Sequence, residues 1–576
     1  MIDNNIEEII YEYTIKNAYQ YKQANVGSVL SKVISRVPDS KNNIKELRDR
    51  INDVVLKVNS FSREKIELDY QKYNDEFKKE YEEKVKATSK PNLTIEGAEK
   101  GNVITRFPPE PGGYIHIGNA KQCILSDEIS KIYEGKIYLY WDDTNPEKCK
   151  EEYVESIKKD LNWLGIKFDK EYFASDNIDV IYSYGKKLIK EGNAYVCTCS
   201  IDEINKNRMD RLECKDRFRS PDKNLKLFED MIDNKIDEGK AIVRFKGDMK
   251  SDNSAMRDPS LFRIKKIPHY RKGTKYVVWP TYHMNTPVLD SLNGITDVIR
   301  SKEYEVWDSV DKLLLSKLNL RIPRFHYEAR LNIEGTITQK RVIRQFMADK
   351  YITKWDDPRL VTIAAMKRRG IMPQAIRNFV LRFGLSKTDT TVKMNMLLDE
   401  NSRIINPIAK HLLFVDNPIK LSINELERDI KIKLLPQNNE DNSYREYKLI
   451  NEIYLSKTDL DKLTFGKPVK LKDLFTIIYD KDKKFAHIDE SAKYEITIPW
   501  VPTNRPLNAD ILIPGNIVDK NGNYNADSLI HRNGIIEQYA KNLSQGDILM
   551  LEKYGYFIVD NMSTPTNQIN LIKISN

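Results

Sequence analysis

The stretch PPEPGGYIHIGNAK, residues 108–121, stands between a strand-like run and a helix-like run. The run before it, NVITRF, is rich in β-branched residues, and the run after it, AKQCILSDEISKIYEG, is typical of a helix. A second strand-like run, KIYLYW (136–141), and a second helix-like run, EEYVESIKKDLNWLG (151–165), follow. Because strand and helix alternate, the sequence predicts a parallel α/β sheet.

A histidine, His116, lies at this strand-to-helix junction, although the chain has only 7 histidines. In α/β sheets of this kind, ligands bind beyond the carboxyl ends of the strands, where helix N-termini suit phosphate. Gly118 allows close approach of the backbone, and His116 can donate a hydrogen bond to a phosphate oxygen as charge develops. The alternative is a histidine that only caps the turn, and the pattern H-x-G alone favours that alternative.

The composition is that of a reduced, multidomain protein. The chain has 576 residues, of which 40% are hydrophobic and 31% charged, so we expect about three to five domains. It contains no apolar run of transmembrane length, and its acidic N-terminus is unlike a signal or transit peptide. Five cysteines make no disulfide framework, so we expect a cytoplasmic protein. The net charge of +9 permits a polyanionic partner.

The character of the sequence changes twice along the chain. The first 94 residues are predicted to be helical, and the breaker SKPNL (89–93) marks a candidate boundary. The segment 345–385 is predicted to be helical again. Beyond about residue 400, β-like runs such as KYEITIPWV and ADILIPGNIVD alternate with turns, which predicts one or two β-barrels.

Several motifs, taken in order, resemble the class I aminoacyl-tRNA synthetases of the glutamyl and glutaminyl subgroup. FPPEPGGYIHIGNAK resembles their first signature, HIGH, and its flank, while TITQKRVIRQF stands where the second signature, KMSKS, belongs. Between the two lie YLYWDDTNPEKCK, AMRDPSLFRI, YVVWPTYHMN and GITDVIRSKEYEVWD, and after them WDDPRLVTIAAMKRRGIMPQAIRNFV, all of which are similar to family segments. ANVGSVLSKVI looks like part of the N-terminal appendage of archaeal glutamyl enzymes.

The resemblance implies an architecture and an activity. It implies an α/β Rossmann-type catalytic domain with an N-terminal helical appendage, a helical stem-contact region and C-terminal anticodon-binding β-barrels. The implied boundaries are 1–94 for the appendage, 95–325 for the catalytic domain with an acceptor-end insertion at 190–275, 326–400 for the KMSKS-like loop and stem-contact region, and 401–576 for the barrels. The implied activity is that of a glutamate–tRNA ligase of the archaeal or eukaryotic kind, which joins glutamate to tRNA(Glu) with ATP and Mg²⁺.

The resemblance also assigns residues to ATP and to catalysis. It places His116, Asn119 and Lys340 in catalysis, where a mobile loop brings the lysine to the ATP phosphates. The ATP-binding residues that it implies are Pro108, Glu110, His116, Gly118, Asn119, Lys340 and Arg341.

Four further residues match the glutamate pocket of the family. Arg106 corresponds to the arginine that meets the amino acid, Asp142 to the aspartate that holds the α-amine, and Tyr282 to the pocket tyrosine. Arg300 corresponds to the residue that is arginine in glutamyl enzymes and small and neutral in glutaminyl ones. A buried arginine facing a neutral amide would remain unpaired, so Arg300 argues for glutamate. Without the resemblance, these residues also suit a helix cap, core positions and a surface arginine.

Other positions depart from the family pattern. Gln339 replaces the usual serine of the second signature, His283 replaces an aspartate that commonly follows the pocket tyrosine, and Tyr140 stands where an arginine is common. Cys197, Cys199 and Cys214 resemble part of a family zinc knuckle. Because Leu212 stands where a fourth cysteine would be, we expect no tightly bound zinc and assign no metal ligand.

Three alternatives remain open at this point. The first is a degenerate synthetase paralogue that binds tRNA without activating glutamate, for which Gln339, His283 and Tyr140 argue. The second is a glutaminyl-tRNA synthetase, which Arg300 disfavours. The third is a small nucleotidyltransferase with an H-x-G-type signature, which the long β-rich tail disfavours. The sequence leaves open whether tRNA(Gln) is also charged, the oligomeric state, the anticodon-reading residues, and whether the N-terminal helices bind a protein partner.

Overall fold

The structure is a computed structural model that describes residues 3–21, 23–37, 44–72, 93–433, 444–463, 466–563 and 567–576. The chain divides into two compact units, residues 1–91 and residues 92–576, and each is described by itself. The boundary that the sequence places at 89–93 lies almost wholly outside the described residues. Within the described residues, no helix combines the length and the apolar character that crossing a membrane requires.

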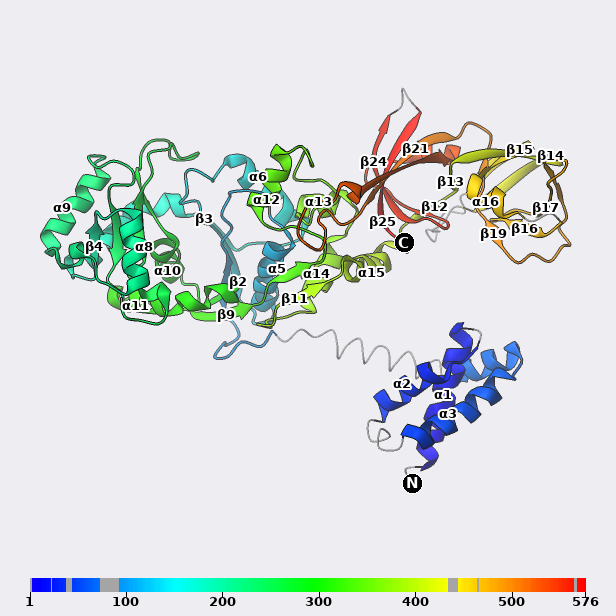
Figure 1. Ribbon diagram of the computed structural model, residues 1–576, viewed down its shortest axis with the longest axis horizontal. Helices are drawn as coiled ribbons and strands as arrows, with labels where there is room; N and C mark the ends of the chain where they lie inside the picture. Colours follow the sequence, from blue (N-terminus) through cyan, green and yellow to red (C-terminus); the bar gives the residue numbers. More distant parts are fainter. Residues whose placement is uncertain are drawn as a thin grey trace. The chain divides into compact units, whose positions relative to one another are not determined.

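The first unit is helical, as the sequence predicts. It contains α1 (Asp3–Tyr21), α2 (Val26–Arg36) and α3 (Ile44–Asn59) (Figure 1). The side chain of Asn25 caps α2 by accepting a hydrogen bond from the backbone of Ser28. Apolar residues at helical spacing, such as Leu47, Ile51, Val55 and Val58 of α3, are buried in a core shared by the three helices.

The N-terminal part of the second unit is built on parallel strands. The strands β1 (Ile104–Phe107), β2 (Lys136–Trp141) and β3 (Lys170–Phe173) form a parallel sheet in the order β1-β2-β3. The strands β8 (Asp297–Ser301) and β9 (Arg324–Glu328) form a second parallel pair. This pair lies beside β1, because the amide of Thr296 donates to the carbonyl of Ile104 (2.9 Å). The predicted parallel α/β architecture is therefore confirmed.

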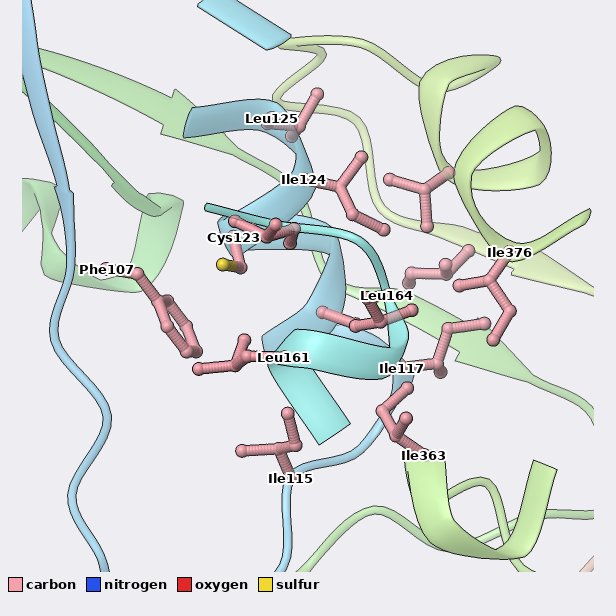
Figure 2. Packing of buried hydrophobic residues seen from close by; sticks show 14 of the residues in the cluster. Phe107, Ile115, Ile117, Cys123, Ile124, Leu125, Leu161, Leu164, Ile363 and Ile376 are labelled. Carbon is pink, nitrogen blue, oxygen red and sulfur yellow. The ribbon is translucent and has the colours of Figure 1, made fainter. Parts of the chain in front are cut away.

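The helix α5 (Ile117–Ile132) fixes the signature stretch against this sheet. It is buried along most of its length and packs against α6 (Glu151–Trp163) and α14 (Pro373–Leu381). In Figure 2, Ile117 and Ile124 of α5 gather with Leu164 and with Ile376 of α14. Because the helix is held on several sides, its N-terminus has a fixed position at the edge of the sheet.

An antiparallel sheet is inserted between β3 and β8. Its strands are β4 (Ala194–Cys197), β5 (Ile242–Phe245), β6 (Ser260–Ile264) and β7 (Val278–Pro280). The accompanying helices are α7 (Ile178–Lys190), α8 (Ile201–Asp210) and α9 (Pro221–Ile232) (Figure 1). After β7 the chain returns through α10 (Tyr282–Leu292) to β8.

Short helices follow the parallel strands. After α11 (Asp308–Leu318), β10 (Leu331–Ile333) pairs with β11 (Thr390–Val392). Between them lie three helices: α12 (Lys340–Ala348), α13 (Ile363–Arg368) and α14. A fourth, α15 (Met394–Ile405), leads into the C-terminal strands.

Two seven-stranded sheets make up the C-terminal region, which confirms its β-rich character. One contains β14 (Pro418–Lys433), β15 (Tyr444–Ser456) and β16–β20 (468–502) in the order β19-β16-β17-β18-β14-β15-β20. The other contains β12 (Lys410–Leu412), β13 (Phe414–Asp416) and β21–β25 (507–575) in the order β12-β23-β24-β25-β21-β22-β13. Both sheets curl around separate cores (Figure 1).

Candidate active site

A cleft of about 660 Å³ lies at the edge where β1, β2 and β8 end and α5 begins. Of the residues that the sequence assigns to ATP, glutamate and catalysis, all but Arg341 line this cleft. They are Arg106, Pro108, Glu110, His116, Gly118, Asn119, Asp142, Tyr282, Arg300 and Lys340. Residues from segments more than 200 positions apart in the sequence therefore share one cavity.

His116 is the N-cap of α5. Its Nδ1 accepts a hydrogen bond from the backbone amide of Gly118 (3.1 Å), and Asn119 Oδ1 accepts one from the amide of His116 (3.2 Å). A Cβ at position 118 would lie 2.9 Å from His116 Cε1, so only glycine leaves room for the folded-back ring. Since Nδ1 is an acceptor, the neutral ring carries its proton on Nε2.

Both interpretations of His116 are therefore compatible, because one nitrogen caps the helix while the residue lines the cleft. Burial, followed by the charge of Lys340, lowers the pKa of His116 to about 4. At neutral pH the ring is thus an uncharged donor, and it does not bring a positive charge to the cleft.

Lys340 opens α12 and reaches back to the signature loop, where its Nζ donates to the carbonyl of Gly113 (3.2 Å). Gly113 has a φ of 146°, and a Cβ there would lie 2.9 Å from Lys340 Cδ. Burial lowers the pKa of Lys340, and the negative charge of Glu110 partly offsets this lowering. Lys340 is thus held close to the loop that carries His116.

The arginine next to Lys340, Arg341, is placed differently from the other residues assigned to ATP. Arg341 is exposed and lies outside the cleft lining, whereas Arg344 donates to the carbonyl of Gly112. The reason is helical geometry, because positions 340 and 344 lie one turn apart and face the same side, while position 341 points away. Helical spacing from Lys340 was the signal that could have identified Arg344.

Arg106 is buried at the inner end of the cleft and is paired with Asp290 of α10. Its Nε donates to both oxygens of Asp290 (3.1 and 3.2 Å), and a second nitrogen, Nη1, reaches the carbonyl of Ile299 (3.4 Å). Sequence reasoning missed Asp290, whose charge is what allows an arginine to be buried here. No local motif links these two residues, which are 184 positions apart.

Asp142 follows β2, and its hydrogen-bond partners among the described residues are neutral polar groups. Its Oδ1 accepts hydrogen bonds from Asn285 (2.8 Å) and from Thr144 (3.3 Å). Burial raises the pKa of Asp142 to about 7, and the negative charges of Glu110 and Asp143 add to this rise. A bound ammonium group would supply a cation and restore the charged carboxylate. Asp142 is therefore a suitable partner for an α-amine.

Arg300, at the end of β8, lies in an acidic environment that the sequence did not reveal. It donates to Tyr282 Oη (3.1 Å), to Asp311 Oδ2 (2.9 Å) and to Asp308. Burial lowers the pKa of Arg300, but Tyr282 and the neighbouring carboxylates raise it by more, so the net shift is upward. The guanidinium is therefore always protonated. The hydroxyl of Tyr282 and this guanidinium face the cleft together.

The positions that depart from the family pattern differ in their distance from the cleft. Tyr140 is fully buried and stacks on Tyr172 with ring centroids 5.0 Å apart, outside the cleft lining. Gln339 lines the cleft as the N-cap of α12. His283 lies against Trp307, with ring centroids 4.6 Å apart, behind Tyr282.

Three cysteines of the insertion lie together with a fourth donor that the sequence did not suggest. The thiol sulfurs and a carboxylate oxygen of Cys197, Cys199, Cys214 and Asp216 all lie within 4.8 Å of one another. The expectation of no zinc rested on the absence of a fourth cysteine at Leu212, and the structure places the carboxylate of Asp216 beside the three thiols instead. Three thiolates and a carboxylate suit a tetrahedral zinc ion, so these residues fit the metal.

The catalytic region matches the family model of tRNA synthetases class I (E and Q), catalytic domain, over residues 102–406. Residues 409–498 match the anti-codon binding domain of the same class. Three curated relatives are named glutamate–tRNA ligase. The protein of Pyrococcus furiosus is 36% identical, and the match covers 96% of this chain and 97% of that protein. The protein of Nitrosopumilus maritimus is 34% identical, and the match covers 96% of this chain and 98% of that protein. The protein of Pyrococcus abyssi is 36% identical, and the match covers 96% of this chain and 97% of that protein. The chain is therefore a member of the class I tRNA synthetases of the glutamate and glutamine group.

Proposed function

We propose that this protein is a glutamate–tRNA ligase, which activates glutamate with ATP and transfers it to the 3′ end of tRNA(Glu). The observation that carries the proposal is the arrangement of the cleft. It brings together a helix N-terminus, His116 and Lys340, which suit phosphates, and Asp142 and Arg300, which suit an amino acid with an anionic side chain. Relatives over nearly the full chain carry this activity in their names.

Enzymes of this class use ATP as a substrate, together with Mg²⁺. In the proposed reaction the α-carboxylate of glutamate attacks the α-phosphorus of ATP, and pyrophosphate leaves. His116 donates from Nε2 and the ammonium group of Lys340 adds positive charge as charge develops on the phosphates. Gly118 and Asn119 fix His116 at the start of α5, because the Gly118 amide donates to its Nδ1 and its own amide donates to Asn119 Oδ1. Pro108 and Glu110 line the nucleotide side of the same cleft.

The glutamate side of the proposal uses both cations and anions. Asp142 receives the α-amine, while Arg300 and Tyr282 face the side-chain carboxylate. Arg106 supports that end of the pocket together with Asp290. No protein nucleophile is required, because the terminal ribose hydroxyl of tRNA attacks the acyl carbon of the mixed anhydride and AMP leaves. Catalysis therefore rests on positioning and on phosphate electrostatics.

The other parts of the chain are assigned to tRNA. In this proposal the antiparallel insertion receives the acceptor end, the helices α12–α15 (340–405) lie along the stem, and the C-terminal sheets read splayed anticodon bases by edge hydrogen bonds and stacking. This division follows the boundaries expected from the sequence: 1–94, 95–325, 326–400 and 401–576.

The first experiment is ATP–pyrophosphate exchange with glutamate or glutamine, each with and without total tRNA. We expect exchange with glutamate only. Arg300→Cys should raise the KM for glutamate by about 100-fold or more, since an ionic partner of a buried carboxylate is lost. Exchange with glutamine would support the glutaminyl alternative, and tRNA binding with no exchange would support a degenerate paralogue.

A further inference from the structure

The partners of Arg300 leave it poorly prepared to bind an anion. One terminal nitrogen, Nη1, is bound to Asp311 and Tyr282, and the other, Nη2, is bound to Asp308. Two carboxylates thus compete with any substrate carboxylate for one guanidinium. Asp308 also faces Lys312 at 3.7 Å and accepts a hydrogen bond from Tyr327, so its charge is shared.

Asp311 has a different environment, because its side chain is only 1% exposed. Its Oδ2 accepts from Arg300, whereas its Oδ1 is buried with no hydrogen-bond partner among the described residues. The cations that face it are Arg300 and, when protonated, His283 of α10. The Nδ1 atom of His283 lies 3.8 Å from Asp311 Oδ1.

The nitrogen of His283 is also a buried atom without a partner in the described part of the chain. Two unpartnered buried polar atoms therefore face each other just beyond hydrogen-bond distance. Burying these two atoms without a hydrogen bond costs free energy. If the ring carries a proton on Nδ1, a small movement of His283 toward Asp311 would form the hydrogen bond and remove this cost. The rings of Trp307 and Tyr282 surround His283 and keep this pair from solvent.

We propose that His283 is a specificity-determining residue: its Nδ1–H donates to Asp311 Oδ1, which weakens the hold of Asp311 on Arg300 and frees Arg300 for the side-chain carboxylate of glutamate. This inference rests on the proposed function and adds a selector to it. His283 does not touch the substrate in this scheme. It acts through Asp311, so it is a positioning residue.

The test is a double-mutant cycle in the exchange reaction at saturating ATP and tRNA, with the full chain. His283→Leu removes the imidazole donor and should raise the KM for glutamate by about tenfold while changing kcat little. Adding Asp311→Asn to that variant removes the anion that holds Arg300 and should return the KM to within about threefold of the wild type. Asp311→Asn alone completes the cycle.

The matched control is His531→Leu, which removes another histidine beside an aspartate (Nδ1 to Asp510 Oδ1, 3.6 Å) in the C-terminal sheet. This variant should leave the KM for glutamate unchanged.

Each outcome has a distinct meaning. If wild-type protein exchanges with glutamate but His283→Leu has the same KM, the inference is wrong and the proposed function stands. If the double variant is as impaired as the single one, His283 only packs against the aromatic rings and the inference is again wrong. If the wild type shows no glutamate-dependent exchange, the proposed function fails, and the selector fails with it.

Discussion

Replacing Asp142 with asparagine should stabilise the protein while removing its use of glutamate. The cleft raises the pKa of this carboxyl from 3.8 to about 7. A rise of about three units corresponds to roughly 4 kcal/mol of unfavourable free energy at pH values well above 7. Because the carboxyl lines an open cleft, we take about half of this, ~2 kcal/mol, as the expected gain in the free energy of unfolding. Asparagine keeps an oxygen that can accept from Asn285.

The sign of the pH dependence follows from the direction of the shift. Between pH 4 and pH 7 the folded wild type holds a proton on Asp142 that the unfolded chain has released, so wild-type stability falls as pH rises through this range. The asparagine variant lacks this loss. The two proteins should therefore unfold at similar temperatures near pH 4, and the variant should be more stable by about 3 °C or more at pH 8.

Thermal unfolding followed by tryptophan fluorescence suits this measurement, because every tryptophan except Trp500 lies between residues 95 and 400. Asp160→Asn is the matched control, since burial also raises the pKa of Asp160 to about 7, but that residue lies outside the cleft. The control should gain stability without a change in the KM for glutamate. For Asp142→Asn, exchange with glutamate should fall by about 100-fold or more. An equal difference in stability at pH 4 and pH 8, or retained glutamate exchange, would refute the reasoning.

Four other changes test the site. Lys340→Met should lower kcat for exchange by about 10²–10³-fold with little change in the KM for glutamate, which steady-state kinetics will show. Gly113→Ala should lower kcat by about 10-fold or more, since the added Cβ displaces the side chain of Lys340, and an unchanged rate would argue against this contact. Asp290→Asn should destabilise the fold by about 3 kcal/mol because Arg106 loses its buried partner, as measured by the same fluorescence transition. Purified protein should contain about one zinc ion per chain in a colorimetric chelator assay, and Cys214→Ser should lose it; a metal-free wild type would leave Asp216 as a hydrogen-bonding residue only.

How much of the site could be predicted depended on whether a residue belongs to a local motif. His116, Gly118 and Lys340 were identified because short stretches contain them, and the structure brings them into one cleft. Asp290 and Asp311 were missed because their importance lies in the cations they face, and those pairs are formed only by the tertiary fold.

The fold shows the same division. Alternating strand and helix patterns predicted a parallel sheet, because the pattern is a property of neighbouring segments. The position of β8 and β9 beside β1 could not be predicted in this way, since nearly two hundred residues, including the whole antiparallel insertion, separate them. Asp216 was overlooked for a related reason: its distance from Cys197 is set by the turn after α8 and not by a regular spacing.

The backbone around His116 is joined to a segment that is made much later during synthesis. The amide of Ile117 donates to the carbonyl of Val361 (3.0 Å), and the amide of Ile363 donates to the carbonyl of Ile115 (3.0 Å). On the ribosome, the signature loop emerges long before the strand-like segment that holds it. Contacts of such high sequence separation form slowly and late. The nucleotide side of the cleft is therefore completed only after about two thirds of the chain has been translated, so a nascent chain shorter than this has no finished site to occupy.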